Sequence, residues 1–190
     1  MRHFSVRPSL TLRGRKNKGL RGLSGKPLHP PLTDIPIGAY LLAAVFDVIS
    51  TVGGDDHGWA QDFWHAGTYA FVGGTAVSVL AAVTGAVDWS RSSQPGTQAR
   101  RTINTHALIM ITVTALTLVD VAVRVSQYDD RSAPVVLTVL SVVIALLVSV
   151  GATYGGSLVF DYGFNVETAG DHPVWHTSEV DVLPGEHSSS

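Results

Sequence analysis

The chain has 190 residues, of which 45% are hydrophobic and 15% are charged, and its formal net charge is −2. This composition excludes a disordered chain, which would be poor in apolar residues, and a nucleic-acid-binding protein, which would be strongly basic. The sequence contains no cysteine, which excludes disulfides, thiolate metal sites and cysteine nucleophiles. Any bound metal must therefore use histidine or carboxylate ligands.

The charged residues avoid four long apolar stretches, which lie at 35–52, 66–87, 107–123 and 133–160 and contain only two charged side chains, Asp47 and Asp120. Each stretch is close to the roughly 20 residues that a helix needs to cross a bilayer. Strands of a membrane barrel are shorter and alternate in polarity, so they do not fit. The sequence therefore excludes a soluble enzyme and predicts an all-α bundle of four transmembrane helices in a lipid bilayer, with spans at about 35–52, 65–88, 105–125 and 133–160.

The membrane domain is predicted to cover residues 27–167, between a flexible basic tail at 1–26 and a disordered acidic tail at 168–190. Lysine and arginine number eight before the first span, three between the second and third, and two between the third and fourth. The positive-inside rule then predicts a multi-pass cell-membrane protein with both termini in the cytoplasm. Three histidines in the acidic tail are more typical of solvated side chains than of a metal site: His172, His176 and His187.

Three prolines stand where the chain approaches the first span: Pro30, Pro31 and Pro36. We expect them to hold an extended approach and to start the first helix at Pro36, with Asp34 as its N-cap. His29 has no such structural role. Its residue type leaves interfacial solvation and a ligand role equally open.

Further polar residues occur near the ends of the other spans. His106, at the start of the third span, can either reach into the interface or pair with Asp88 at the end of the second. Asp120 has a local partner in Arg124, four residues later, which also reaches toward the outer headgroups. Asp47 has no such neighbour and must find a partner across the bundle. We expect that partner to be His65, because the two lie at a comparable depth.

Glycines and alanines lie along the second and fourth spans, including Gly73, Gly74, Gly85, Gly151, Gly155 and Gly156. Small residues allow the backbones of two membrane helices to approach closely. A flat cofactor such as haem would also fit between glycine-lined helices. Plain helix contact is the more frequent use of such residues.

Four segments, in chain order, carry a family resemblance: LHPPLTDIPIGAYLLAAVFD, TGAVDW, RRTINTHALIM and GATYGGSLVFDYGFNVE. Together they resemble the domain-of-unknown-function 2231 family over about residues 25–167. The resemblance implies a four-helix membrane module of unestablished activity, found alone or beside a Rieske-type iron–sulfur domain, and so an electron-transfer setting. The positions that match the family pattern are His29, Asp34, Pro36, Asp47, Asp88, Trp89, His106, Gly155 and Gly156. Relatives often have histidine where this chain has Ser157, so one familial ligand is missing. If the family binds haem through imidazoles, the resemblance implies that this member uses His29 with His106 or has lost the site.

The sequence leaves two functions open and indicates no catalytic residue. The first is a redox membrane subunit that holds haem b or a quinone between helix ends, uses His29 and His106 as ligands, and exchanges electrons with a partner protein. The alternative is a non-catalytic membrane scaffold or partner subunit, in which the polar residues only specify helix pairing. A proton-coupled transporter is disfavoured, because four helices without an inverted repeat would have to form a homo-oligomer.

Overall fold

The computed structural model describes residues 19–22 and 25–166 and contains four long helices. These are α1 (His29–Gly53), α2 (Gly58–Ser92), α3 (Gln98–Ser126) and α4 (Val135–Phe160). All four are long and apolar enough to cross a membrane, which confirms the predicted all-α four-helix architecture. The predicted tails, with His172, His176 and His187, lie outside the described residues, apart from 19–22 and 25–26.

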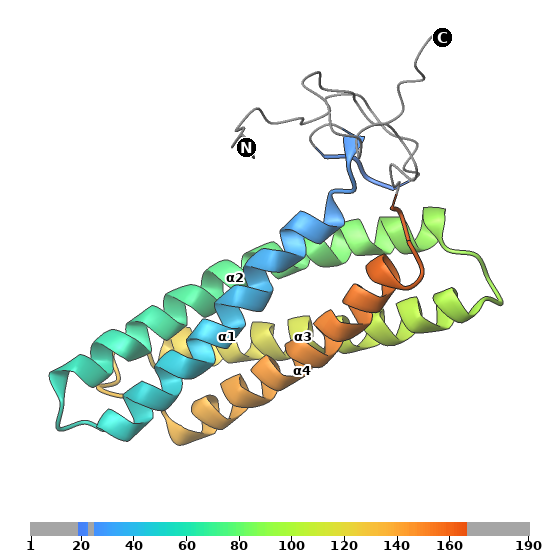
Figure 1. The fold of residues 1–190 in the computed structure, drawn as a ribbon. Helices are drawn as coiled ribbons and strands as arrows, with labels where there is room; N and C mark the ends of the chain where they lie inside the picture. The colour runs from blue at the N-terminus through green and yellow to red at the C-terminus, as the bar shows by residue number, and fades with distance from the viewer. Residues whose placement is uncertain (1–18, 23–24, 167–190) are drawn as a thin grey trace, which may run out of the picture.

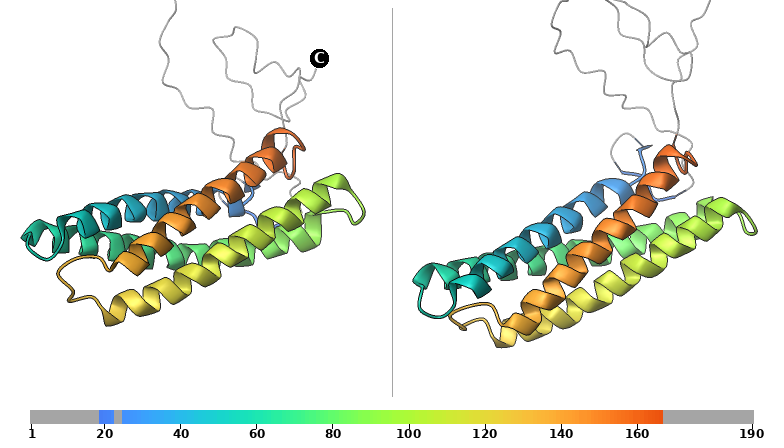
Figure 2. Two further views of the ribbon diagram at one scale, coloured as in Figure 1. Left: turned by 90° about the horizontal axis from the view of Figure 1, so that it is seen from below. Right: turned by 60° about the horizontal axis from the view of Figure 1, so that its bottom comes forward.

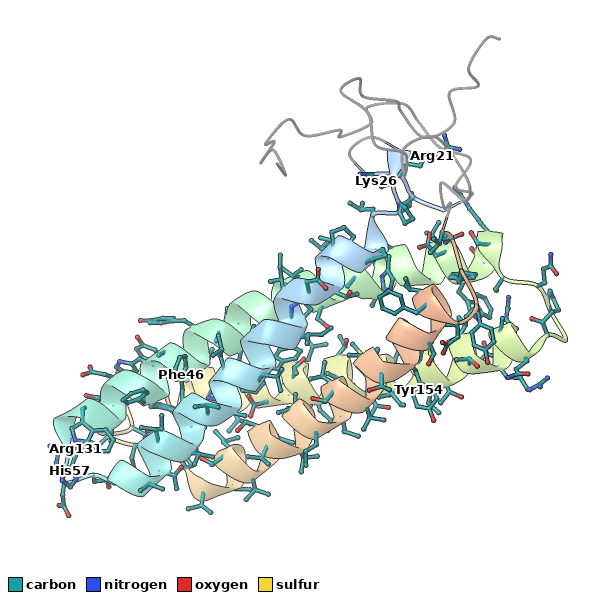
Figure 3. The ribbon with its side chains drawn as sticks, in the orientation of Figure 1. Arg21, Lys26, Phe46, His57, Arg131 and Tyr154 are labelled. Carbon is teal, nitrogen blue, oxygen red and sulfur yellow. The ribbon has the colours of Figure 1, made fainter. Side chains whose placement is uncertain are left out.

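The helices run alternately up and down and pack as a ring (Figures 1 and 2). Within the described residues, the backbone of α1 lies next to those of α2 and α4, and the backbone of α3 lies next to the same two, whereas α1 and α3 meet only through side chains. Helices α1 and α3 are therefore diagonal partners, as are α2 and α4. We call the end of the bundle where α1 begins and α4 finishes the termini end, and the other the opposite end. Figure 3 places Arg21 and Lys26 at the termini end and His57 and Arg131 at the opposite end.

The distribution of polarity is inverted relative to a water-soluble bundle. Large apolar side chains face outward on every helix, for example Leu42, Leu80, Leu108 and Leu146. The interior instead contains many polar and charged side chains: Asp47, Ser50, Thr68, Thr75, Ser78, Thr84, Asp88, Thr117, Asp120, Arg124, Thr138 and Ser141. Lipid solvates apolar surface as well as a protein core does, so polar groups are the ones that gain from burial between membrane helices.

The start of α1 differs from the sequence-based expectation. The chain turns back on itself before the helix, since the Leu28 amide donates to the Leu20 carbonyl at 3.0 Å. Helix α1 then begins at His29, and Pro30 and Pro31 occupy its first turn, where a backbone N–H has no intrahelical partner to lose. Pro36 lies inside the helix and is buried. The expected extended approach is therefore wrong.

The expected role of Asp34 is also wrong. It lies within α1 with an exposed side chain, and the N-cap position is occupied by Leu28, which makes no side-chain capping bond. Because the prolines fill the first turn, few free amides remain there for a carboxylate to cap.

The short connections at the opposite end are tied together by Ser50. Its hydroxyl donates to the Ala60 carbonyl at 2.6 Å and accepts from the Ala133 amide at 2.8 Å. Gly54, at φ 63°, ends α1 in a conformation that favours glycine and lets the chain return within four residues. This end of the bundle is thereby fixed around the buried charges described below.

Candidate functional sites

Two histidines from diagonal helices face each other inside the bundle near the termini end. The ring centroids of His29 on α1 and His106 on α3 are 6.4 Å apart, and the ring planes are inclined by 83°. The sequence indicates both residues as ligand candidates. The structure brings them together.

Each imidazole is fixed by a backbone carbonyl of a neighbouring helix. The Nδ1 of His29 lies 2.9 Å from the Ala81 carbonyl on α2, and the Nδ1 of His106 lies 2.9 Å from the Gly151 carbonyl on α4. Since a carbonyl can only accept, both Nδ1 atoms carry the proton. In the neutral rings each Nε2 then presents a lone pair, and within 19–22 and 25–166 neither Nε2 makes a hydrogen bond. This is the arrangement by which proteins orient histidine ligands.

Glycines on the second diagonal make room for these rings. A Cβ at Gly85 of α2 would lie 2.8 Å from the Cε1 of His29, and a Cβ at Gly155 of α4 would lie 3.1 Å from the Cε1 of His106. A Cβ at Gly156, the next residue in sequence, would meet nothing within 4 Å. Each imidazole therefore lies against bare helix backbone, which a larger residue at Gly85 or Gly155 would disturb.

The alternative pairing of His106 with Asp88 does not occur in the described part of the chain, where His106 bonds instead to the Gly151 carbonyl. Asp88 is buried and lies beside Gly19, in the segment that precedes α1. Nearby, Trp89 donates to the Asn104 side chain at 2.8 Å and stacks under the Arg100 guanidinium at 3.9 Å. These contacts join the end of α2 to the start of α3.

A second cluster lies toward the opposite end and consists of Asp47, Asp120 and Arg124, all with 0% exposed side chains. The guanidinium pairs with Asp47 through both terminal nitrogens, with 3.0 Å from Nη1 to Oδ1. Its Nε donates to the Oδ2 of Asp120, while the Oδ1 of Asp120 has no hydrogen-bond partner in the described part of the chain. We call these three residues the ion cluster.

Aromatic and small residues of α2 surround the ion cluster. The guanidinium carbon of Arg124 lies 4.7 Å from the ring centre of Trp64 and 4.2 Å from that of Phe71, which adds cation–π contacts. Gly67 lies between them in sequence, and a Cβ there would come within 2.6 Å of the Oδ1 of Asp47. The cluster therefore contacts little on α2 besides ring faces and backbone.

The sequence predicts the Asp120–Arg124 pair, which is confirmed, but not the place of its arginine. Arg124 is expected to reach the headgroups and is instead fully buried. The expected contact between Asp47 and His65 is wrong, because Asp47 is taken by Arg124. The Nε2 of His65 lies 3.0 Å from the Tyr128 carbonyl, and its ring stacks on the Tyr128 ring with centroids 4.2 Å apart.

Between the two sites, hydroxyl groups lie beside an apolar core cluster that includes Phe71, Val113 and Ile144. The Tyr40 hydroxyl lies 3.4 Å from the Thr75 Oγ1 and 3.3 Å from the Thr117 Oγ1, and Ser78 lies 2.7 Å from Thr114. These hydroxyl contacts were not predicted from the sequence. The available signal was the spacing of three and four residues between polar positions on one face of α3, at 114, 117, 120 and 124.

The comparison with protein-family models decides the family. A model described as a predicted membrane protein, DUF2231, matches residues 25–168, which include all four helices and both sites. The chain belongs to the DUF2231 family. No curated protein and no solved structure matches this DUF2231 chain. The family description names a predicted membrane protein and gives no activity for either site.

Proposed function

We propose that this DUF2231 protein is a redox-associated membrane subunit that binds one haem b between His29 and His106. The observation that carries the proposal is the pair of diagonal imidazoles, 6.4 Å apart, each with its Nδ1 bonded to a carbonyl. Haem b is the haem type to expect, since a chain without cysteine cannot attach the group covalently through thiols.

The separation of the rings supports axial ligation of one iron. A histidine nitrogen binds a metal at about 2 Å, and the ring centre lies about 1 Å further away, so two ligands on opposite sides of one metal have ring centres about 6 Å apart. The observed 6.4 Å agrees with this distance.

The number of ligands favours a haem over a bare metal ion. Among the residues that the structure describes, no group of three or more His, Asp or Glu side chains is placed to hold a metal. Zinc and similar ions take about four protein ligands in structural sites, whereas haem iron brings four nitrogens of its own and needs only two. Two opposed histidines therefore match the number of protein ligands that haem iron needs.

The hydrogen bonding favours a haem over a quinone. Both Nδ1–H groups are already used by carbonyls, so the neutral imidazoles offer lone pairs at Nε2. The carbonyl oxygens of a quinone need donors, which these nitrogens do not supply. A metal centre is a better match to two free lone pairs.

Bound haem would supply one-electron chemistry, and His29 and His106 would be the residues that hold it. The chain's own residues hold the site. Ala81 and Gly151 orient the two imidazoles through their carbonyls, and Gly85 and Gly155 let the rings lie directly against the backbones of α2 and α4. A partner protein exchanging electrons would reach the site from the termini end, where both histidines lie.

Titration of the purified protein with hemin tests the proposal. We expect binding to saturate at one haem per chain, with the sharp visible bands of a six-coordinate low-spin haem after reduction. A protein that shows no haem absorption band after free hemin has been removed would refute it and favour the non-catalytic scaffold.

We also propose that the termini end faces the cytoplasm. Eight lysines and arginines precede α1 and three lie from Arg91 to Arg101, whereas the connection between α3 and α4 has Arg131 and the nearby Arg124 is buried in the ion cluster. The absence of native cysteine allows a clean test with single cysteines at Ser93 and Asp130. A membrane-impermeant thiol reagent applied to whole cells should label position 130 and not position 93; the reverse pattern would contradict the orientation.

A further inference from the structure

We propose that the ion cluster is a proton-binding site, in which Asp120 holds one proton on its Oδ1. The site lies apart from the histidine pair, near the opposite end of the bundle, and the proposal does not depend on haem. It follows from the charges, burial and hydrogen bonds of three residues: Asp47, Asp120 and Arg124.

The ion cluster has more acids than bases. Two carboxylates and one guanidinium, all fully buried, leave one negative charge without a partner. The groups packed around them add none, because α2 presents Trp64, Gly67 and Phe71, and α4 has no ionisable side chain from Val135 to Thr153. An uncompensated charge inside a membrane bundle is costly, and ionisable groups there become neutral instead. One bound proton makes the cluster neutral.

The hydrogen bonds of the four carboxylate oxygens indicate which atom holds the proton. Both oxygens of Asp47 accept from Arg124, so that carboxylate is held in its ionised form. Asp120 accepts from Arg124 through Oδ2 only, and its Oδ1 is buried without any hydrogen-bond partner in residues 19–22 and 25–166. Leaving a neutral hydroxyl unpaired costs much less than leaving a charged oxygen unpaired. The Oδ1 of Asp120 is therefore the favoured position.

A monovalent metal cation could also neutralise the ion cluster in place of a proton. Hard cations bind several oxygens at once. Around the cluster, Arg124 already uses three of the four carboxylate oxygens, and α2 supplies aromatic faces. The hydroxyl of Thr68 donates to the Trp64 carbonyl within the same helix. The surroundings suit a proton and offer too few oxygens for a cation.

Infrared spectroscopy of the purified full chain tests the proposal, because a protonated carboxyl has a C=O band that shifts in D2O. We expect the wild type at neutral pH to show this band, with an intensity of one carboxyl per chain that Asp120→Asn removes. Asp47→Asn should remove it as well, since the remaining pair of Asp120 and Arg124 is neutral without a proton. Asp34→Asn, which changes an exposed acid, should leave the band unchanged.

Asp88 is the other buried acid in the described residues, so its own band is separated by the difference between wild type and Asp120→Asn. Both cluster variants leave one acid for one base and are expected to fold, which circular dichroism checks. A wild-type spectrum with no difference from Asp120→Asn would overturn the proposal. Stability that depends on sodium at constant ionic strength, without a protonated-carboxyl band, would also overturn it and assign the site to a cation.

Discussion

Replacing Arg124 by leucine is expected to lower the free energy of unfolding by about 3–5 kcal/mol, which is comparable to the stability of a small domain. The substitution leaves Asp47 and Asp120 buried side by side without their shared cation. The substitution also removes the cation–π contacts of the guanidinium with Trp64 and Phe71. Unfolding of the detergent-solubilised protein, followed by circular dichroism during titration with a denaturing detergent, measures the effect.

The matched control is Arg131→Leu, which removes an exposed arginine from the connection between α3 and α4. Its unfolding transition should stay within about 0.5 kcal/mol of the wild type. Adding Asp47→Asn and Asp120→Asn to Arg124→Leu should restore a large part of the lost stability, since no buried charge then remains. If Arg124→Leu were as stable as Arg131→Leu, the buried ion cluster could not be a main determinant of this bundle.

Removing either histidine of the pair is expected to reduce bound haem from about one per chain to less than about a tenth, because one of the two residues that would hold the iron is then lost. His29→Ala and His106→Ala should both keep their helical content, since neither side chain carries the packing of the core. Absorption spectra of the variants after hemin titration, normalised to protein, give the occupancy. His65→Ala is the control, because His65 contacts Tyr128 and not the pair.

A gentler pair of variants separates ligand geometry from helix packing. Gly155→Ala places a methyl group 3.1 Å from the Cε1 of His106, whereas Gly156→Ala meets nothing within 4 Å. We expect the first to weaken haem affinity by about 10-fold and the second to leave it unchanged. Equal effects of the two glycine variants would show that helix α4, and not the orientation of His106, limits binding.

The four helices could be predicted from the sequence because each is indicated by the composition of its own segment alone. Long stretches without charge are enough to indicate transmembrane helices, whatever their neighbours are. The start of α1 could not be predicted in the same way. Pro30 and Pro31 disfavour helix in the interior but suit its first turn, and the choice depends on where the helix begins.

The partners inside the bundle depend on facts that the sequence does not contain. Residue type and depth indicate His29 and His106 as ligand candidates, but their opposition requires α1 and α3 to be diagonal. The sequence correctly predicts that Asp47 finds its partner across the bundle, yet the identity of that partner depends on the rotation of each helix. Long cationic side chains usually extend outward, which predicts Arg124 at the headgroups, and here two carboxylates hold it inside.

The most direct test of the histidine pair is the electron paramagnetic resonance spectrum of the oxidised, haem-loaded protein. Two axial imidazoles whose planes are inclined by 83° predict a low-spin ferric signal with the strong anisotropy of near-perpendicular ligand planes. His29→Ala and His106→Ala should each lose it. A high-spin signal from the wild type, or no haem signal at all after loading, would contradict the assignment of His29 and His106 as the two ligands.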